Sequence, residues 1–349
     1  MTHVLIARQD NLGDVLLAGP CVRAVAAGAS RVTLLTGPNG RAAGELLLGV
    51  DDLMTWLAPW IDPQPPPVTA AGTGAFVREV RQRAPDRALI LTSFHQSPLP
   101  LALLLRQAGV PWIGAISDDY PGSLLDLRHH VDGDPPEALR MLSLAEAAGY
   151  RLPEHDHGGL AVRRPLPNTT RLTGGGPYVV VHPGASVPAR RPSAEWSHRL
   201  VRALVARGYR VVVTGNRAER ELTRRVAGHA AVDLGGHTPL AELASVLTGA
   251  QVVVAPNTGA AHLAAAAGTP VVSLFAPVVP AARWAPYGVP AALLGDQHAP
   301  CRGSRARTCP VRGHPCLEAI DPAEVCRAVA ELAEPEPAAV AGFPASVTG

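Results

Sequence analysis

The amino-acid sequence alternates short β-branched or aliphatic runs with longer stretches rich in Ala, Leu and Arg, and this alternation constrains the fold more than any other feature. Parallel strands that are covered by helices on both faces appear in a sequence as such short apolar runs. We therefore expect an α/β fold. The predicted strands are residues 4–7, 32–35, 89–91 and 112–115 in the first half and 178–181, 210–213, 252–255 and 271–274 in the second. The predicted helices include residues 15–27, 193–207, 219–227 and 240–248.

The chain has 349 residues, which is more than a single hydrophobic core usually accommodates. A segment rich in Pro, Gly and Thr separates the two halves and contains few periodic apolar positions. We predict two Rossmann-like, doubly wound domains that face a central cleft, where such folds bind their ligands. The predicted boundaries are 1–165 for the N-terminal domain, 166–177 for the linker, 178–333 for the C-terminal domain and 334–349 for a disordered, Pro- and Ala-rich tail.

Composition excludes several classes of function. All 31 basic residues are Arg, so the sequence has no P-loop lysine, and no basic run is interleaved with aromatics as in a nucleic-acid groove. The apolar runs are too short to span a bilayer, and the N-terminus lacks the features of a signal peptide. We expect a cytoplasmic protein with at most peripheral membrane contact and no nucleic-acid partner. Its five cysteines should be reduced thiols.

The first candidate site is the loop of residues 8–14, which follows a predicted strand and leads into a helix. Asp14 lies near the start of that helix, where it either caps the helix or presents a carboxylate to the cleft as a general base. Gly13 either makes a tight turn or lines the acceptor side of the cleft. A second N-terminal loop, residues 91–97, contains His95 and Gln96, which could line an acceptor pocket or simply form a polar loop.

Two loops of the second half suit a nucleotide. Residues 182–192 combine small residues, among them Ser186, with the guanidinium of Arg190, and backbone amides beside a forked cation fit a diphosphate. The alternative is a surface loop with solvated arginines. Glu219 begins a predicted helix after the next strand, so it could accept hydrogen bonds from ribose hydroxyls or act only as a first-turn acid.

The strongest segment joins a buried-type strand, residues 252–255, to a small-residue helix start that contains Asn257, Thr258, Gly259 and His262. The free amides of a helix N-terminus form an anion site, which predicts a phosphate-binding segment. The alternatives are that Asn257 or Thr258 caps the helix and that His262 is a hydrogen-bonded core histidine.

A cysteine-bearing loop raises the question of a metal. Cys301, Cys309 and Cys316 are separated by eight and seven positions, which is not the spacing of a zinc knuckle, and His314 is the obvious fourth ligand. We predict a folded loop and no metal site.

Taken in order, residues 10–14, 182–190, 257–262, 275–277 and 283–288 resemble the heptosyltransferase family, glycosyltransferase family 9. The resemblance implies a GT-B fold, an ADP-heptose donor in the C-terminal domain, an acceptor in the N-terminal domain and inversion of the anomeric centre. It also implies no cofactor.

By the same resemblance Asp14 corresponds to the base, Arg190 to the cation that faces the diphosphate and Glu219 to the ribose contact. Thr258, Gly259 and His262 correspond to the phosphate segment. Asn257 stands where members usually carry Asp, and Arg190 where they usually carry Lys.

The expected function is thus a metal-independent, inverting glycosyltransferase of cell envelope glycan biosynthesis, which moves a sugar to a glycan, glycolipid or small-molecule hydroxyl. Two alternatives share the fold: a nucleotide-sugar 2-epimerase, which needs no acceptor, and a non-catalytic nucleotide-sugar binder.

Overall fold

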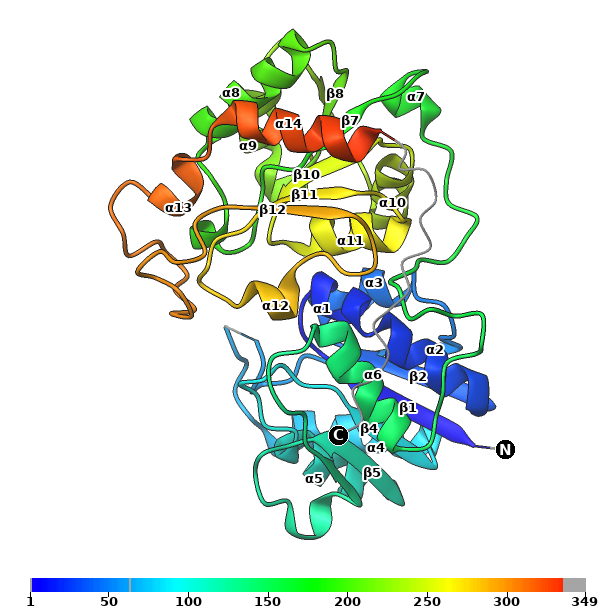
Figure 1. Cartoon of the computed structure of the whole chain (residues 1–349). Coiled ribbons are helices and arrows are strands. Elements are labelled where there is room, and N and C mark those ends of the chain that lie inside the picture. Colours follow the sequence, from blue (N-terminus) through cyan, green and yellow to red (C-terminus); the bar gives the residue numbers. More distant parts are fainter. Residues whose placement is uncertain (1, 63, 335–349) are drawn as a thin grey trace, which may run out of the picture.

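The computed structural model describes residues 2–62 and 64–334 and contains two α/β domains stacked one above the other (Figure 1). Within these residues each domain has one six-stranded parallel sheet, with strand orders β3-β2-β1-β4-β5-β6 and β12-β11-β10-β7-β8-β9. The order reverses beside the first strand of each sheet, so each domain has the doubly wound topology that the sequence predicts.

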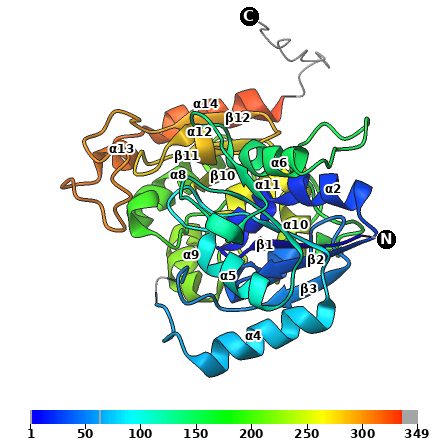
Figure 2. The ribbon, with the colours of Figure 1, turned by 90° about the horizontal axis from the view of Figure 1, so that it is seen from below.

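The strands of the first sheet are β1 (His3–Arg8), β2 (Arg31–Thr36), β3 (Asp52–Thr55), β4 (Arg87–Ile90), β5 (Trp112–Ile116) and β6 (Leu127–His129). The helices of this domain are α1 (Leu12–Leu17), α2 (Gly19–Gly28), α3 (Arg41–Gly44), α4 (Ala70–Arg83), α5 (Leu99–Gln107) and α6 (Glu137–Ala147). Alternate side chains of β1 enter different cores. Val4 and Ile6 pack with α1, α2 and α6, whereas Leu5 and Ala7 pack with α4 and α5 on the other face. Figure 2 shows α4 at the outer edge of the molecule.

The strands of the second sheet are β7 (Val179–Val181), β8 (Val211–Val213), β9 (Val232–Asp233), β10 (Val252–Pro256), β11 (Val271–Leu274) and β12 (Ala291–Leu294). The helices are α8 (Ala194–Ala206), α9 (Arg220–Ala227), α10 (Leu240–Thr248), α11 (Gly259–Ala267), α12 (Ala281–Trp284), α13 (Pro315–Glu318) and α14 (Pro322–Ala333). Helices α8, α9 and α14 share one core with this sheet, and α10 and α11 lie in the other.

The core under α10 and α11 is continuous with that of the N-terminal domain. Leu263 and Ala264 of α11 belong to the same buried cluster as Leu16 and Leu17 of α1. The two domains are therefore joined by apolar packing as well as by the chain that connects them. That connection includes the short helix α7 (Thr170–Thr173), which lies inside the predicted linker.

All eight predicted strands are present in the described residues, with ends shifted by a few positions. The prediction missed β3, β6, β9 and β12, which are the four edge strands of the two sheets. Their side chains are largely half-buried or exposed, whereas the central strands are buried almost throughout. An edge strand does not need a continuous apolar run, so its sequence carries little strand signal.

The predicted helix of residues 15–27 is helical except at Ala18, but it consists of two helices and not one. Helix α1 ends at Leu17 and helix α2 begins at Gly19, so the helix is interrupted at Ala18, just before Gly19 and Pro20. Proline is tolerated in the first turn of a helix but not inside one, so a new helix begins there. Of the predicted tail, residues 335–349 lie outside the described residues.

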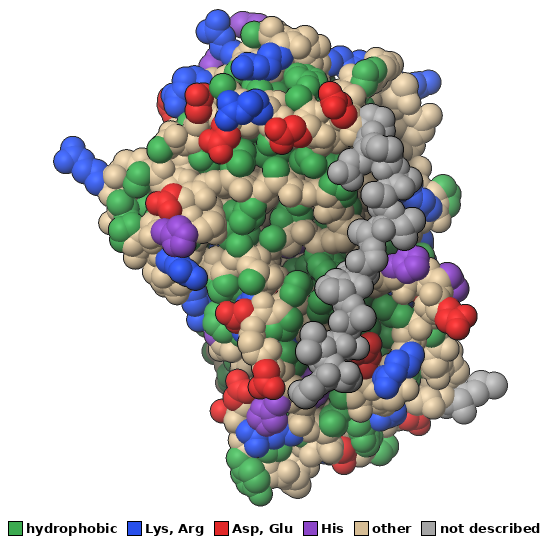
Figure 3. Space-filling view, viewed as in Figure 1, with side chains coloured by type: hydrophobic (Ala, Val, Ile, Leu, Met, Phe, Trp, Pro, Cys, Tyr) green, Lys and Arg blue, Asp and Glu red, His purple; other side chains and the backbone are tan. Residues whose placement is uncertain are grey.

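Charged side chains of both signs are mixed over the face in Figure 3, and the described part of that face has no continuous basic stripe. In residues 2–62 and 64–334, no helix combines the length and the apolar character that crossing a membrane requires.

Candidate active site

A cavity of about 370 Å³ lies between the domains, at the carboxyl ends of β1 and β10. The N-terminal ends of α1 and α11 converge on it. The predicted site residues that line it are Gly13, Asp14, His95, Gln96, Ser186, Arg190, Asn257, Thr258, Gly259 and His262. Glu219 is the one predicted site residue that does not. Loops far apart in the sequence therefore meet at one place, as expected where two doubly wound domains face each other.

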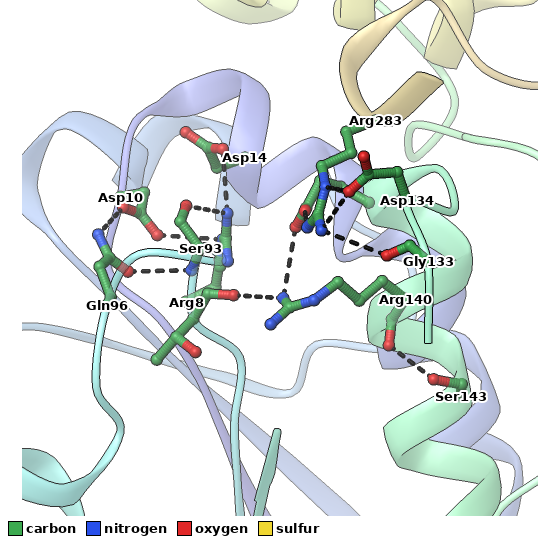
Figure 4. Close-up of polar contacts among 12 residues, drawn as sticks. Arg8, Asp10, Asp14, Ser93, Gln96, Gly133, Asp134, Arg140, Ser143 and Arg283 are labelled. Carbon is green, nitrogen blue, oxygen red and sulfur yellow. Dashed lines mark hydrogen bonds and ion pairs between the residues drawn. The ribbon is translucent and has the colours of Figure 1, made fainter. Parts of the chain in front are cut away.

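Asp14 is in the first turn of α1, but it does not cap that helix. Its Oδ1 accepts a hydrogen bond of 3.0 Å from Nη2 of Arg8, the last residue of β1. Figure 4 shows the second oxygen of Asp14 pointing away from Arg8. The buried guanidinium thus fixes the carboxylate and leaves an oxygen that can accept a proton.

Arg8 is completely buried and binds side chains that line the cavity. Its Nε lies 3.2 Å from Asp10 Oδ2, and its Nη2 donates a 3.0 Å hydrogen bond to Ser93 Oγ. Gln96 is occupied at both ends, because its Nε2 donates to Asp10 Oδ1 at 2.6 Å and its Oε1 accepts from Ser93 N at 3.0 Å. Gln96 therefore holds the loop of residues 91–97 against Asp10, while the neighbouring His95 is exposed and lines the cavity.

The predicted phosphate segment has buried polar groups without partners at the start of α11. Thr258 is the N-cap residue of α11, yet its side chain makes no capping hydrogen bond. Asn257 and His262 are 3% and 4% exposed, and Asn257 Nδ2 and His262 Nδ1 have no hydrogen-bond partner among the described residues. The two alternatives, a capped helix and a hydrogen-bonded core histidine, are thus not what the structure contains. A buried polar atom without a hydrogen-bond partner costs free energy, which favours a ligand that supplies the missing partners.

Burial lowers the pKa of His262 to about 4. Nearby Asp14 opposes this shift and nearby Arg190 adds to it, so these three side chains are close in space although they come from both domains. At neutral pH the imidazole of His262 is uncharged and offers one nitrogen as a donor and the other as an acceptor.

Arg190 lies in a single-turn helix, Pro188–Arg190, and is half-buried in the cavity wall. Its Nε is buried and has no partner among the described residues. Arg190 therefore lines the cavity, and it is not the solvated surface arginine of the alternative interpretation.

Glu219 is engaged in local structure. Its Oε2 accepts a 2.9 Å hydrogen bond from Asn216 N and forms a capping box with that residue. Gly184 lies directly against this carboxylate, because a Cβ added to Gly184 would overlap Glu219 Oε1. Glu219 therefore lies beside the loop of residues 182–192 but outside the cavity lining.

The cysteine loop is folded. Cys301 and Cys316 are buried, and all five cysteines are free thiols. Burial, reinforced by the neighbouring thiols of Cys301 and Cys309, raises the pKa of Cys316 to about 12. His314 Nε2 lies 3.1 Å from the carbonyl oxygen of Ala189. In the part of the chain that the structure describes, no three His, Cys, Asp or Glu side chains are arranged to hold a metal ion.

Sequence reasoning missed four charged residues of the site. Arg8 and Asp10 were passed over beside Asp14, although an arginine that ends a buried apolar strand has to be paired. Arg305 and Arg307 line the cavity from the loop that carries Cys301 and Cys309. The sequence of that loop indicates only a candidate metal site.

Arg283, at the end of α12, crosses from the C-terminal to the N-terminal domain (Figure 4). It donates hydrogen bonds to Asp134 Oδ1 at 2.7 Å and to Glu137 Oε1 at 3.1 Å. Glu137 is completely buried and also lies 3.6 Å from Arg140, which donates to the carbonyl oxygen of Thr92 at 2.6 Å. This network connects the C-terminal domain to the loop that follows β4.

Comparisons with known proteins identify the family of the chain. The model of glycosyltransferase family 9 (heptosyltransferase) matches residues 73–314. Lipopolysaccharide heptosyltransferase 1 of Pseudomonas aeruginosa is 32% identical over 246 residues, which cover 66% of this chain and 66% of that relative. Lipopolysaccharide heptosyltransferase 1 of Salmonella typhimurium is 26% identical over 299 residues, covering 80% of this chain and 89% of the relative.

Similar solved structures include a family 9 glycosyltransferase from Veillonella parvula, with a TM-score of 0.76, 18% identity and coverage of 95% of this chain and 97% of that one. Escherichia coli heptosyltransferase WaaC with ADP-2-deoxy-2-fluoro heptose has a TM-score of 0.72 at 20% identity and covers 95% and 99%. The fold is therefore GT-B. Because the family model matches more than half of its length, the chain belongs to glycosyltransferase family 9, the heptosyltransferase family.

Proposed function

We propose that the chain is an inverting glycosyltransferase that moves heptose from ADP-heptose to a hydroxyl group of a glycan or glycolipid. One observation carries the proposal. A carboxylate from the N-terminal domain, Asp14, and the unpartnered polar atoms of Asn257 and His262 from the C-terminal domain line the same cavity. A base and an anion site on opposite walls are what transfer from a nucleotide-sugar requires.

In the proposed reaction the acceptor hydroxyl lies beside Asp14, and the diphosphate lies at the N-terminus of α11. The hydroxyl oxygen forms a bond to the anomeric carbon while the bond from that carbon to the diphosphate oxygen breaks. The hydroxyl proton passes to the free oxygen of Asp14, and the electron pair of the broken bond stays on the diphosphate. Attack from the face opposite the leaving group inverts the anomeric centre.

The donor contacts follow from the chemistry of each group. The first amides of α11, at Gly259 and Ala260, and the amide group of Asn257 donate to phosphate oxygens. Arg190 supplies charge, and Ser186 offers a hydroxyl. Glu219 would bind the ribose hydroxyls if the nucleoside extends from the cavity along the loop of residues 182–192, because the Glu219 carboxylate packs against Gly184 of that loop.

The choice of donor and acceptor rests on the relatives. One similar protein, WaaC, was solved with an ADP-heptose analogue, and the two curated relatives are lipopolysaccharide heptosyltransferases by name. We take ADP-heptose as the donor and a lipopolysaccharide-type glycolipid as the first acceptor to test, with Gly13 and His95 on the acceptor side of the cavity.

A thermal-shift screen of ADP, GDP, UDP and their sugars tests the donor, because a ligand of the folded state raises Tm. We expect ADP and ADP-heptose to raise Tm. A response to UDP compounds alone would refute the donor assignment. An epimerase would convert ADP-heptose without an acceptor, whereas a transferase would not. Incubation of the chain with ADP-heptose alone, followed by NMR, should therefore give no epimer.

Transfer is then measured by mass spectrometry as heptose added to truncated lipopolysaccharide. Asp14→Asn should abolish transfer and keep the ADP-induced rise in Tm. Asp62→Asn is the matched control, because Asp62 lines the same cavity but accepts a 2.8 Å hydrogen bond from Gln64 N. Normal transfer by Asp14→Asn would show that Asp14 is not the base.

A further inference from the structure

Three guanidinium groups, those of Arg190, Arg305 and Arg307, line the cavity on the side of the C-terminal domain. In residues 2–62 and 64–334, none of them forms an ion pair with a carboxylate. The acidic side chains of the lining, Asp10, Asp14 and Asp62, all belong to the N-terminal domain, and Asp10 and Asp14 are both paired with Arg8. The cavity therefore carries unbalanced positive charge on one wall.

The backbone holds this cluster together. Ala189 N, next to Arg190, donates a 3.0 Å hydrogen bond to the carbonyl oxygen of Arg307. Arg305 N donates a 2.8 Å hydrogen bond to the carbonyl oxygen of Val278, in the loop after β11. The loop that carries Arg305 and Arg307 is thus tied to both neighbouring loops of the cavity, and the three cations do not meet by the chance placement of long side chains.

The arrangement costs free energy in the absence of an anion. Burial lowers the pKa of Arg190, and the charges of Arg307 and Arg305 lower it further, although Asp14 acts in the opposite direction. Arg305 also has a φ of +57°, in the left-handed region where glycine is unstrained. Backbone strain and like-charge repulsion of this kind are typical of ligand-binding sites, so we infer that these arginines face a ligand.

The neighbouring groups indicate which ligand this is. Arg190 Nε and Asn257 Nδ2 are buried donors without partners among the described residues, and both residues line the same cavity. The guanidinium carbon of Arg305 lies over the ring of Phe94, 5.4 Å from its centre, within the range of a cation–π contact. Several forked donors beside a helix N-terminus fit an anion with many oxygens, as a diphosphate has.

We propose that Arg305 and Arg307 bind the diphosphate of the donor together with Arg190 and stabilise it as it leaves. The inference rests on the proposed function and adds two residues to the reacting site. When the bond between the anomeric carbon and the diphosphate oxygen breaks, its electron pair adds a negative charge to the diphosphate. Fixed cations beside that oxygen stabilise the charge more than they stabilise the intact donor, which is how they accelerate the reaction.

The test compares the binding of ADP and adenosine to the full chain by calorimetry. Arg305→Ala and Arg307→Ala should each weaken ADP binding by about tenfold and leave adenosine binding unchanged. Arg302→Ala and Arg312→Ala are matched controls, because these arginines lie on the same loop but do not line the cavity, and their affinity for ADP should equal that of the unmodified chain. Arg305→Gly separates the side chain from the backbone, because glycine accepts the left-handed φ. It should bind ADP as weakly as Arg305→Ala.

Transfer gives a second readout. With saturating donor, Arg307→Ala should lower kcat as well as affinity, since the group acts on charge that develops during the reaction. ADP affinity within about twofold of the unmodified chain in the double variant Arg305→Gly/Arg307→Ala would overturn the inference. Equal weakening of ADP and adenosine would overturn it too, because a phosphate contact cannot affect adenosine. Failure of the unmodified chain to bind ADP would instead refute the proposed donor.

Discussion

Gly13 of α1 and Gly259 of α11 meet backbone to backbone across the domain boundary. A Cβ built on Gly13 would lie 3.2 Å from Gly259 Cα and 2.8 Å from His262 Cδ2. A Cβ built on Gly259 would lie 2.8 Å from Leu12 Cδ2 and 3.4 Å from Gly13 N. The pair lets two helix N-termini approach one cavity, and this approach brings Asp14 and the phosphate segment together.

Gly13→Ala should therefore separate the two helices. We expect it to destabilise the chain by about 1–3 kcal/mol, as overpacking does, and to weaken transfer more than ADP binding. Urea unfolding and calorimetry measure the two effects. Gly74→Ala is the control, because Gly74 lies within α4 and its added Cβ would meet only Arg78 Nη1, at 3.6 Å. That change should be neutral or stabilising. An equal loss of stability in both variants would contradict the proposed close contact.

The stability of the chain should also depend on Arg8, because this side chain is completely buried and paired with two carboxylates. Arg8→Met should cost about 3–5 kcal/mol of unfolding free energy, since it leaves the nearly buried Asp10 without its cation. Arg8→Met/Asp10→Asn should recover most of the loss. Denaturant unfolding of the single and double variants forms the cycle. If the double variant were as unstable as Arg8→Met alone, an unpaired Asp10 would not be the cause.

The sequence could predict the fold class and central strands because a buried strand has to be continuously apolar. Residues 252–255 show the signal clearly, and they form most of β10. The edge strand β9 could not be predicted in this way, because both of its residues are exposed. The break at Ala18 was also missed, since the apolar pattern of α1 continues into α2 and only Pro20 marks the division.

The residues of the candidate site likewise include some that the sequence could predict and some that it could not. Asp14, Arg190 and His262 could be proposed because each lies in a loop or helix start that directly follows a strand, and parallel strands carry such positions to one edge of the sheet. Arg305 and Arg307 follow no strand directly, and tertiary hydrogen bonds, among them those to Val278 and Ala189, hold their loop at the cavity. No local pattern encodes such long-range contacts.

The buried His262 predicts a dependence of stability on pH. Burial lowers its folded pKa from 6.5 to about 4, so between these values the unfolded chain binds more protons than the folded chain. Stability should therefore be lost as pH falls through this window, by about 2 kcal/mol between pH 7 and pH 5 from this group. His262→Gln should remove that part of the slope in urea unfolding. His229→Gln, at an exposed position, should not. Parallel slopes for His262→Gln and the unmodified chain would exclude His262 as the source.

Arg283 predicts how the domains are held together. Arg283→Ala leaves the completely buried Glu137 with only Arg140, 3.6 Å away, so we expect a loss of about 3–5 kcal/mol in unfolding free energy. Arg283→Met/Glu137→Gln should recover much of it, because the unpaired charge is then absent. Arg225→Ala is the control: its ion pair with Glu195 is exposed to solvent, so its removal should cost far less unfolding free energy than that of Arg283. Small-angle scattering should show a larger radius of gyration for Arg283→Ala, because this side chain joins the C-terminal domain to α6. An unchanged radius with an unchanged unfolding free energy would mean that apolar packing between α1 and α11 alone holds the domains.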